Sequence, residues 1–529
     1  MSTRPPLADE AAREDARRAL GESLLVEAGA GTGKTTLIVE RIANLVEAGV
    51  PIERVVAITF TEKAAGELKL RVRRALELRS ADASRDDRAR ALAREALAAI
   101  ERASISTIHA WCARLLREHP VEAGIDPLFA VLDGSAREAL FDRVWDAWLS
   151  RELAADRDPP IREVSLYTPE EWLRALRSMA RHILEHRAWL PGALPAEVGG
   201  DPVGDAERTM RAFDPDALAA HASNPDDLLV SALRRVGALR ARFLDATPDL
   251  RRDMLLRHEN LGRNGYERVG NRANWSGTGL GTARAAIDAA QQAWIAARSA
   301  LANDVLARVA RWLCDGFLAE YEEEKRLAGV LDFEDLLVRA RDLLRDNAAV
   351  RRRVRRGLHL ILDEFQDTDP VQCEAAFRLA AEGEPGDWRE GAPAPGALFL
   401  VGDPKQSIYA FRGADVETYS TARGLLEERR ALRAISTNFR SRASVLEWIN
   451  ASFAALLSPP DDAEAARYEI AYAPLDIHHA VNADGNGVHV VRPAKDVEFE
   501  TIAQSRDAEA RTVAALLRDH AHGHWIVRD

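Results

Sequence analysis

The chain has 529 residues, of which 47% are hydrophobic and 29% are charged. This length exceeds what one hydrophobic core supports, so roughly two to four domains are expected, and the composition is that of a soluble globular protein. The formal net charge of −12 excludes nucleic-acid binding by the field of the whole protein, so any such contact needs a local basic surface.

The sequence predicts a cytoplasmic protein without a membrane segment. It offers no run of about eighteen apolar residues, and the polar residues 1–15 lack the core of a signal peptide. Its three cysteines, Cys112, Cys314 and Cys373, are far apart and form no C-x-x-C pair. This spacing argues against a disulfide framework, cysteine-bound zinc or an iron–sulfur cluster, and it favours packed thiols.

A phosphate-binding loop is predicted within residues 23–42, SLLVEAGAGTGKTTLIVERI, where an apolar strand runs through a glycine-rich turn into a helix. Ala28, followed by Gly33, Lys34 and Thr35, meets the spacing of a P-loop. Lys34 is suited to the β/γ-phosphates of ATP and Thr35 to Mg²⁺. The predicted cradle comprises Ala28, Gly29, Ala30, Gly31, Thr32, Gly33, Lys34, Thr35 and Thr36. The alternative is a glycine-rich turn without a ligand.

Further along the chain, short apolar runs alternate with helical patterns, as expected of a parallel sheet. Residues 7–22 are predicted to form a helix that caps the nucleotide site, and RVVAITF (54–60) a strand. A helix with a cationic side is predicted over 61–79, and a strand and helix over 103–120.

From about 121 to 320 the pattern becomes that of a helical insertion. The Gly/Asn-rich stretch 261–281 is predicted to be a mobile loop, with its GTGLG end a linker, and a long helix is predicted through 282–327. RRRVRR (351–356) is a basic cluster that surface solvation explains about as well as phosphate contact.

Acidic residues end the apolar strand within LHLILDEFQDTDPVQ (358–372). Parallel sheets place their chemistry at such strand ends. Asp363 is suited to hold the Mg²⁺ shell, and Glu364 is suited to orient and deprotonate an attacking water molecule. Forty residues on, the stretch 397–417 provides another strand, followed by Tyr409, Phe411 and Arg412, a candidate stacking platform for unpaired bases. Core packing of both rings is the alternative.

In order, these stretches resemble the superfamily 1 helicases of the UvrD/Rep type, along nearly the whole chain. The matching motifs are AGAGTGKTT, AITFTEKAAGELKLRV, ISTIHAWC with LLREHP, LILDEFQDT, VGDPKQSIYAFRGAD and STNFRS. LDFEDLL further resembles the RecB/AddA branch. The resemblance implies that Gln406 and Arg440 reach the γ-phosphate, with Arg440 as an arginine finger. It also implies that Phe60 and Phe411 stack on bases, with Thr59, His109, Tyr409 and Arg412 near the DNA strand.

Two departures from the family pattern stand out. Residues 7–16 contain no glutamine to read adenine, and Ala12 stands near its expected place. The chain ends before anything that resembles the later motifs, so the second motor domain is expected to be incomplete and the chain to be the N-terminal part of a longer protein. That domain's opening would hold the NFRS strand, GVHVV (487–491) and a helix over 508–520.

The predicted fold is α/β, a P-loop RecA-like parallel sheet domain with a large helical insertion and the start of a second RecA-like domain. The expected units are a first RecA-like domain in two parts (1–120 and 321–430), the insertion (121–320) and the second domain's opening (431–529).

The predicted function is an ATP-dependent DNA helicase or translocase in double-strand-break repair and recombination, and the family resemblance implies 3′-to-5′ movement. Its expected partners are single-stranded or duplex-end DNA and a second helicase–nuclease subunit. The alternatives are a nucleotide-gated DNA-binding or regulatory subunit without efficient turnover, and a P-loop ATPase that does not act on nucleic acid.

Overall fold

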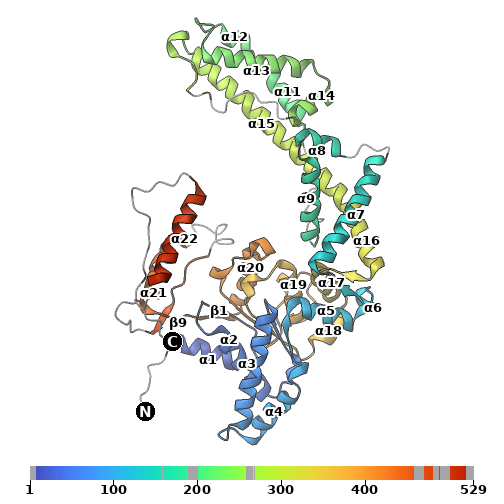
Figure 1. Ribbon diagram of the computed structural model, residues 1–529, viewed down its shortest axis with the longest axis vertical. Helices are drawn as coiled ribbons and strands as arrows, with labels where there is room; N and C mark the ends of the chain where they lie inside the picture. The colour runs from blue at the N-terminus through green and yellow to red at the C-terminus, as the bar shows by residue number, and fades with distance from the viewer. Residues whose placement is uncertain are drawn as a thin grey trace.

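The computed structural model describes residues 7–155, 160–168, 170–188, 200–257, 266, 268–457, 470–479, 488 and 501–519. Figure 1 shows a sheet domain surrounded by helices, a long helical arm that rises from it, and a C-terminal part beside the sheet. The predicted α/β class, with a parallel sheet and a large helical insertion, is confirmed.

Six parallel strands form the main sheet, in the order β3-β2-β6-β7-β1-β8. Their bounds are β1 Leu24–Ala28, β2 Val55–Thr59, β3 Ser104–Thr107, β6 His359–Leu362, β7 Leu398–Gly402 and β8 Leu432–Ile435. Every residue of β2 and β7 is buried. Since alternate residues of a strand face opposite sides, both faces of the sheet are covered, and this explains the unbroken apolar runs in the sequence.

Helices pack around this sheet in one continuous hydrophobic core. They are α1 Glu10–Arg18, α2 Lys34–Glu47, α3 Glu62–Ala81, α4 Asp87–Ala98, α5 Ile108–Glu118, α6 Pro120–Ala123, α17 Phe333–Asp346, α18 Ala348–Arg355, α19 Pro370–Ala380 and α20 Val416–Glu427. Because all six strands run the same way, their carboxyl ends meet at one edge of the sheet, which we call the carboxyl edge.

The arm has a hydrophobic core of its own, from Leu140 to Tyr321. It contains α7 Gly134–Ala154, α8 Ile161–Tyr167, α9 Trp172–Glu185, α11 Pro202–Ala212, α12 Pro215–Ala219, α13 Leu228–Asp245, α14 Pro248–Leu256, α15 Gly279–Trp312 and α16 Ala319–Ala328. At its base, β4 Ala130–Val131 pairs in parallel with β5 Val330–Leu331.

The long helix predicted over 282–327 is present, but a π-helical turn, Leu313–Leu318, separates α15 from α16. At this turn Gly316 lies against α7, where an added Cβ would stand 2.8 Å from Trp148 Nε1. The prediction of a linker at GTGLG is wrong for its last three residues, Gly279–Gly281, which form the first turn of α15. Leu280 is buried there, so packing outweighs the low helix propensity of its two glycine neighbours.

The C-terminal part follows β8 directly. It contains β9 Thr437–Arg442, α21 Ala443–Leu456, β10 Asp476–His479 and α22 Ile502–Asp519, and β10 pairs in parallel with β9. The strand predicted at GVHVV lies outside the described residues, apart from Val488, as do residues 261–265 and 267 of the predicted mobile loop. Among the residues that the structure describes, no helix combines the length and apolarity that a membrane crossing requires.

A buried group of charges joins the arm to the sheet domain. Arg187, just after α9, lies 2.5 Å from Asp332 and 2.8 Å from Asp335, the two acids that form the capping box of α17. Lys325 of α16, only 1% exposed, lies 2.6 Å from Asp335. Burial acts to raise the pKa of Asp332, but Arg187 and Lys325 outweigh it and lower that pKa to about 2. These acids are the conspicuous residues of LDFEDLL, so that stretch has a structural role.

Replacing Lys325 by alanine should lower the free energy of unfolding by about 3–5 kcal/mol, because it leaves buried carboxylates without one of their cations. Urea denaturation followed by circular dichroism measures the change. The matched control is Arg326→Ala on the next residue, whose exposed ion pair with Glu323 should contribute little to the free energy of unfolding. Equal effects of the two substitutions would contradict a structural role for the buried cluster.

Candidate functional site

The glycine-rich loop after β1 enters α2 through residues with a left-handed backbone. Gly31 has a φ of 73° and Gly33, which caps α2, a φ of 89°. A Cβ at Gly31 would lie 2.7 Å from Asn438 Nδ2, so only glycine fits there. The predicted residues Ala28 to Thr36 form the end of β1, this loop and the first turn of a 14-residue helix. The arrangement is that of an anion-binding loop at a helix N-terminus.

The loop lies directly beside the acidic residues that follow β6. Lys34 Nζ donates a hydrogen bond of 2.7 Å to Glu364 Oε2. Glu364 has a φ of 54°, a left-handed conformation that is uncommon outside glycine and stores strain. Two stretches 330 residues apart in the sequence therefore meet at the carboxyl edge.

The acidic group carries more negative charge than Lys34 balances. Burial raises the pKa of Asp363 to about 6, the charge of Glu364 adds to this shift, and Lys34 acts against it. The pKa of Asp367 is raised to about 6 for the same reasons. Mg²⁺ prefers hard oxygen ligands and would relieve this excess of negative charge. The chemistry of Asp363, together with the Thr35 hydroxyl on the first turn of α2, therefore fits the predicted Mg²⁺ site.

One glutamine side chain connects β6 and β7 at the carboxyl edge. Gln366 Nε2 donates to Glu364 Oε2 at 2.9 Å, and Gln366 Oε1 accepts from the Asp403 backbone N–H at 2.9 Å. Its backbone carbonyl accepts from Ser407 Oγ at 3.1 Å. Gln406, predicted to reach the γ-phosphate, donates instead to Asp403 at 2.7 Å in this structure. Gln366 was not predicted from the sequence, although it lies inside the DEFQDT motif.

The strand β9 lies on the loop itself. Phe439 N–H donates to the Gly31 carbonyl at 2.9 Å, and Asn438 Nδ2 donates to the Ala30 carbonyl at 2.6 Å. Arg440 is exposed, and its Cβ would lie 2.8 Å from a Cβ added to Gly31. Arg440 therefore stands beside the phosphate loop, and its role as an arginine finger stays a prediction.

Next to the loop is a pocket of about 320 Å³. Its lining residues are Leu7, Glu10, Arg13, Arg17, Gly33, Thr36, Leu37, Glu40 and Phe439. The Arg13 guanidinium lies over the Phe439 ring, 5.0 Å from its centroid. Ala12 packs against the core of the sheet domain and does not line this pocket. Because this pocket lies beside Gly33 and Thr36, it is the candidate site for the base of a nucleotide.

A row of rings lies further along the carboxyl edge. Phe60 and Tyr409 stack with centroids 4.9 Å apart, and the centroids of Tyr409 and Phe411 are 5.7 Å apart. Phe60 is 37% exposed and Phe411 79% exposed. The alternative that Phe411 belongs to the core is therefore wrong, while half-buried Tyr409 supports its two neighbours. Together the three rings form a surface suited to stacking of bases.

The remaining residues predicted to contact DNA are His109, Thr59 and Arg412. His109 is half-buried, its pKa is lowered by burial, and its ring packs edge to face on Phe333 at 5.4 Å. Phe333 is 53% exposed and was missed, although it stands inside LDFEDLL. Thr59 is buried and donates its hydroxyl to the Thr61 carbonyl. The side chain of Arg412 lies outside what the structure describes.

The basic cluster at 351–356 has structural partners. Arg351 and Arg355 donate to backbone carbonyl groups, of Leu344 and Ala381, and Arg352 pairs with Glu384. These contacts satisfy three of its arginines within the protein and favour the structural explanation over phosphate contact.

Known proteins resemble this chain along most of its length. The sequence profile of the UvrD/REP helicase N-terminal domain matches residues 9–426. An ATP-dependent helicase/nuclease subunit of Ligilactobacillus salivarius is 27% identical over 511 residues, which cover 84% of this chain and 38% of that protein. The protein of the same name from Geobacillus kaustophilus is 29% identical over 514 residues, 83% of this chain and 38% of the relative.

A third relative of that name, from Carboxydothermus hydrogenoformans, is 27% identical over 572 residues. That alignment covers 94% of this chain and 44% of the relative. The chain thus spans 38–44% of the length of these three relatives.

Replacing Asp363 by asparagine should stabilise the nucleotide-free protein at pH 7.5 while it weakens Mg²⁺-dependent nucleotide binding. A carboxyl whose pKa rises from 3.8 to about 6 on folding stabilises the fold below pH 4, and this contribution is lost as the pH rises through 6. The gain at pH 7.5 should therefore reach up to about 3 kcal/mol and shrink at pH 5.

Thermal unfolding at both pH values, without nucleotide or Mg²⁺, measures this difference. The control is Glu95→Gln on the exposed surface of α4, which should change stability little at either pH. Destabilisation by Asp363→Asn at pH 7.5 would mean that the carboxylate is a structural group.

Proposed function

The chain belongs to the UvrD/REP helicase N-terminal domain family, and on this premise we propose that it carries the ATP-binding half of a DNA helicase that translocates on single-stranded DNA. The resemblance inferred from the order of motifs is confirmed by the match over residues 9–426 and by the relatives of the RecB/AddA branch. ATP hydrolysis and DNA movement are proposals for this chain, and its contacts at the carboxyl edge support them.

One observation carries the proposal: a chain of hydrogen bonds connects the phosphate loop to the row of rings. It runs from Lys34 through Glu364 to Gln366, and from Gln366 to the backbone of Asp403 and the hydroxyl of Ser407. Ser407 stands two residues before Tyr409 in the same short segment. A change at the nucleotide therefore has a direct physical route to the surface proposed to hold bases.

The contact between Lys34 and Glu364 suggests how ATP starts the reaction. The β/γ-phosphates would replace the Glu364 carboxylate as the partner of Lys34, because they bring more negative charge. Glu364 would then be released to orient water and take its proton. Asp363 and Thr35 would hold Mg²⁺, which neutralises charge on the phosphates. Gln406 and Arg440 would reach the γ-phosphate from the two sides of the loop.

Single-stranded DNA would cross the carboxyl edge along Phe60, Tyr409 and Phe411. Exposed rings give stacking with every base, which suits movement that does not depend on sequence. His109 of α5 and the exposed Phe333 of α17 form a second aromatic pair. These rings thus provide local binding to DNA, which the negative net charge of the whole chain does not favour.

The nucleotide base would enter the pocket beside Arg13 and Phe439. Its rim carries Glu10 and Glu40, both in ion pairs with Arg17. Since the stretch 7–16 holds no glutamine, these charged groups are the available readers of the base, and we expect weak discrimination among nucleoside triphosphates.

The finer assignments are proposals too. The name of the relatives, a helicase/nuclease subunit, supports a partner subunit. The family resemblance supports action in DNA repair and recombination and 3′-to-5′ movement, and the cytoplasmic location predicted from the sequence is a proposal as well. Separate hydrophobic cores of the sheet domain and the arm support the division between 121–320 and the two parts 1–120 and 321–430. The start of a further unit at 431–529 stays a prediction, and β8 at its beginning pairs with β1 in the main sheet.

A second candidate is a nucleotide-gated DNA-binding subunit without efficient turnover. It is favoured by the ion pair between Lys34 and Glu364, which occupies both the phosphate-binding cation and the proposed base. Hydrolysis of ATP in the presence of single-stranded DNA separates the two functions.

Replacing Glu364 by glutamine should leave ATP and Mg²⁺ binding intact but slow DNA-stimulated hydrolysis by about 10²- to 10⁴-fold, the usual effect of losing a positioned base. Phosphate release and fluorescent-nucleotide binding measure the two properties. Lys34→Ala is the comparison, since it should reduce binding as well. An unmodified protein that binds DNA and ATP but hydrolyses none would favour the second candidate.

Replacing Phe411 by alanine should weaken single-stranded DNA binding by about 1–3 kcal/mol, the contribution of one stacked base. Because Phe411 is 79% exposed, the change should leave thermal stability and DNA-free ATP affinity nearly unaltered. Fluorescence anisotropy of a labelled oligonucleotide measures the loss. Phe411→Tyr is the matched control and should retain binding. Unchanged DNA affinity in the alanine variant would remove this ring from the proposed track.

A further inference from the structure

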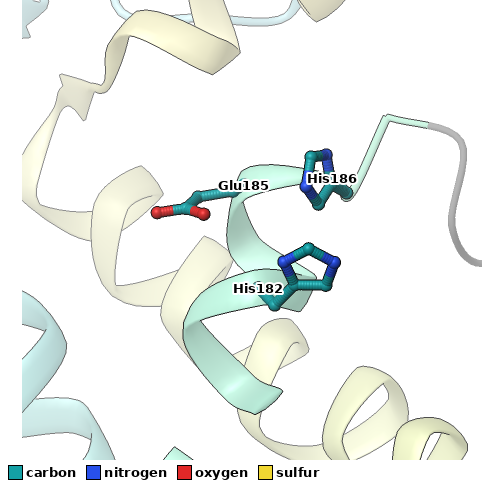
Figure 2. Close-up of side chains that lie close together, drawn as sticks. All are labelled: His182, Glu185 and His186. Atoms are coloured by element: carbon teal, nitrogen blue, oxygen red, sulfur yellow. The ribbon is translucent and has the colours of Figure 1, made fainter. Parts of the chain in front are cut away.

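Three potential metal ligands gather at the C-terminal end of α9, away from the residues of the proposed motor site. Figure 2 shows His182, Glu185 and His186 on the last turn of this helix. One ligand atom from each residue lies within 4.8 Å of the other two, and the imidazole centroids are 4.3 Å apart. Among the residues that the structure describes, no other group of three acidic, histidine or cysteine side chains is this close.

The spacing has a simple structural basis. Residues four apart on a helix lie on one face, so His182 and His186 present their rings side by side. Glu185, three residues after His182, adds a carboxylate to the same group. Two imidazole nitrogens and one carboxylate oxygen are a ligand set that zinc sites use, with solvent at the remaining position.

The place of the group on its helix also favours a cation. The negative end of the helix dipole lies at the C-terminus, and His186 is the C-cap residue of α9. Glu185 and the last carbonyl groups of the helix add to this negative field. A cation here would therefore meet one carboxylate, two imidazole rings and a favourable helix end.

We propose that the end of α9 binds one divalent transition-metal ion of the zinc class through His182, Glu185 and His186. Nitrogen and oxygen ligands without thiolate suit Zn²⁺, Ni²⁺ and Cu²⁺ better than Ca²⁺ or Mg²⁺. The sequence argued only against a cysteine-bound zinc site, and this site uses no cysteine.

A bound ion would hold the last turn of α9 next to the connection between arm and sheet domain. Arg187 follows His186 directly and reaches Asp332 and Asp335 at the start of α17. By linking residues 182 and 186 through the metal, the site would restrain fraying of the turn from which Arg187 enters that cluster. Its role is structural and separate from ATP chemistry.

The experiment must separate this group from a second histidine-rich stretch. His520, His522 and His524 lie close together in the sequence, outside the described residues. The full chain with these three residues changed to alanine is therefore the reference protein. Zinc titration by calorimetry, competition with a chromophoric chelator and the visible spectrum of the Co²⁺ form are then compared among variants.

The reference protein should bind one Zn²⁺ per chain. Either His182→Ala or His186→Ala should weaken this binding at least about tenfold, and Glu185→Gln should weaken it less, because a neutral oxygen ligand remains. His221→Ala, an exposed histidine elsewhere in the arm, is the matched control and should leave affinity unchanged. Zinc should also slow amide hydrogen exchange around residues 182–187 in the reference protein only.

Two results would overturn the proposal. One is the lack of saturable binding by the reference protein up to about 100 µM zinc, well above the range of specific sites. The other is unchanged affinity after simultaneous replacement of His182 and His186. Since both side chains lie at the helix surface, circular dichroism should show these variants folded. If His186→Ala alone unfolds, His182→Ala and Glu185→Gln still decide the outcome.

Discussion

Parallel pairing of six short strands brings together the phosphate loop, the acids and the rings of the candidate site. The strands have four or five residues each, so their ends differ little in height and the segments that follow them meet at one edge. The phosphate loop follows β1, the acids follow β6, Phe60 follows β2, and the segment of Tyr409 and Phe411 follows β7. The order β3-β2-β6-β7-β1-β8 puts β7 between the strands that lead to the loop and to the acids. The Gln366 side chain bridges the segments that follow β6 and β7, because it donates to Glu364 and accepts from the Asp403 backbone N–H.

The N-terminal helix fastens the C-terminal part to this edge. The Asp9 carboxylate accepts hydrogen bonds from Ser436 N–H, Thr437 N–H and Arg13, and Arg13 continues to the Thr32 carbonyl in the phosphate loop. Burial opposes ionisation of Asp9, but its bonds with Arg13 and Thr437 outweigh burial and hold its pKa well below the ordinary value. The sequence predicts that a helix within residues 7–22 caps the nucleotide site. In the structure α1 and its N-cap connect the phosphate loop to β9 through the buried charges of Asp9 and Arg13.

Local patterns predicted the parts of the site, and contacts distant in sequence decided how they combine. The P-loop, the strand before Asp363 and the long helix after residue 282 each follow from a spacing or an apolar run. Gln366 could not be assigned from its neighbours, because its role depends on Asp403, 37 residues away. The ring of Phe333 and the base pocket with Arg13 and Phe439 likewise need tertiary contacts. At GTGLG the glycine-rich composition predicted a linker, but Gly279–Gly281 are helical because burial of Leu280 outweighs the flexibility of glycine.

The π-helical turn between α15 and α16 has a consequence for insertions and deletions. Such a turn usually holds one residue more than an α-helix would. The extra residue is absorbed within this turn, so deleting one residue within Leu313–Leu318 would restore an α-helix there without rotating α15 relative to α16. A deletion within the regular part of α15 would instead rotate the residues before it by about 100° about the helix axis. Such a rotation would turn part of the buried face of α15, which includes Leu301 and Val305, away from the core of the arm. The π-helical turn is therefore the place in this long helix that can lose one residue without a change in the direction of the arm.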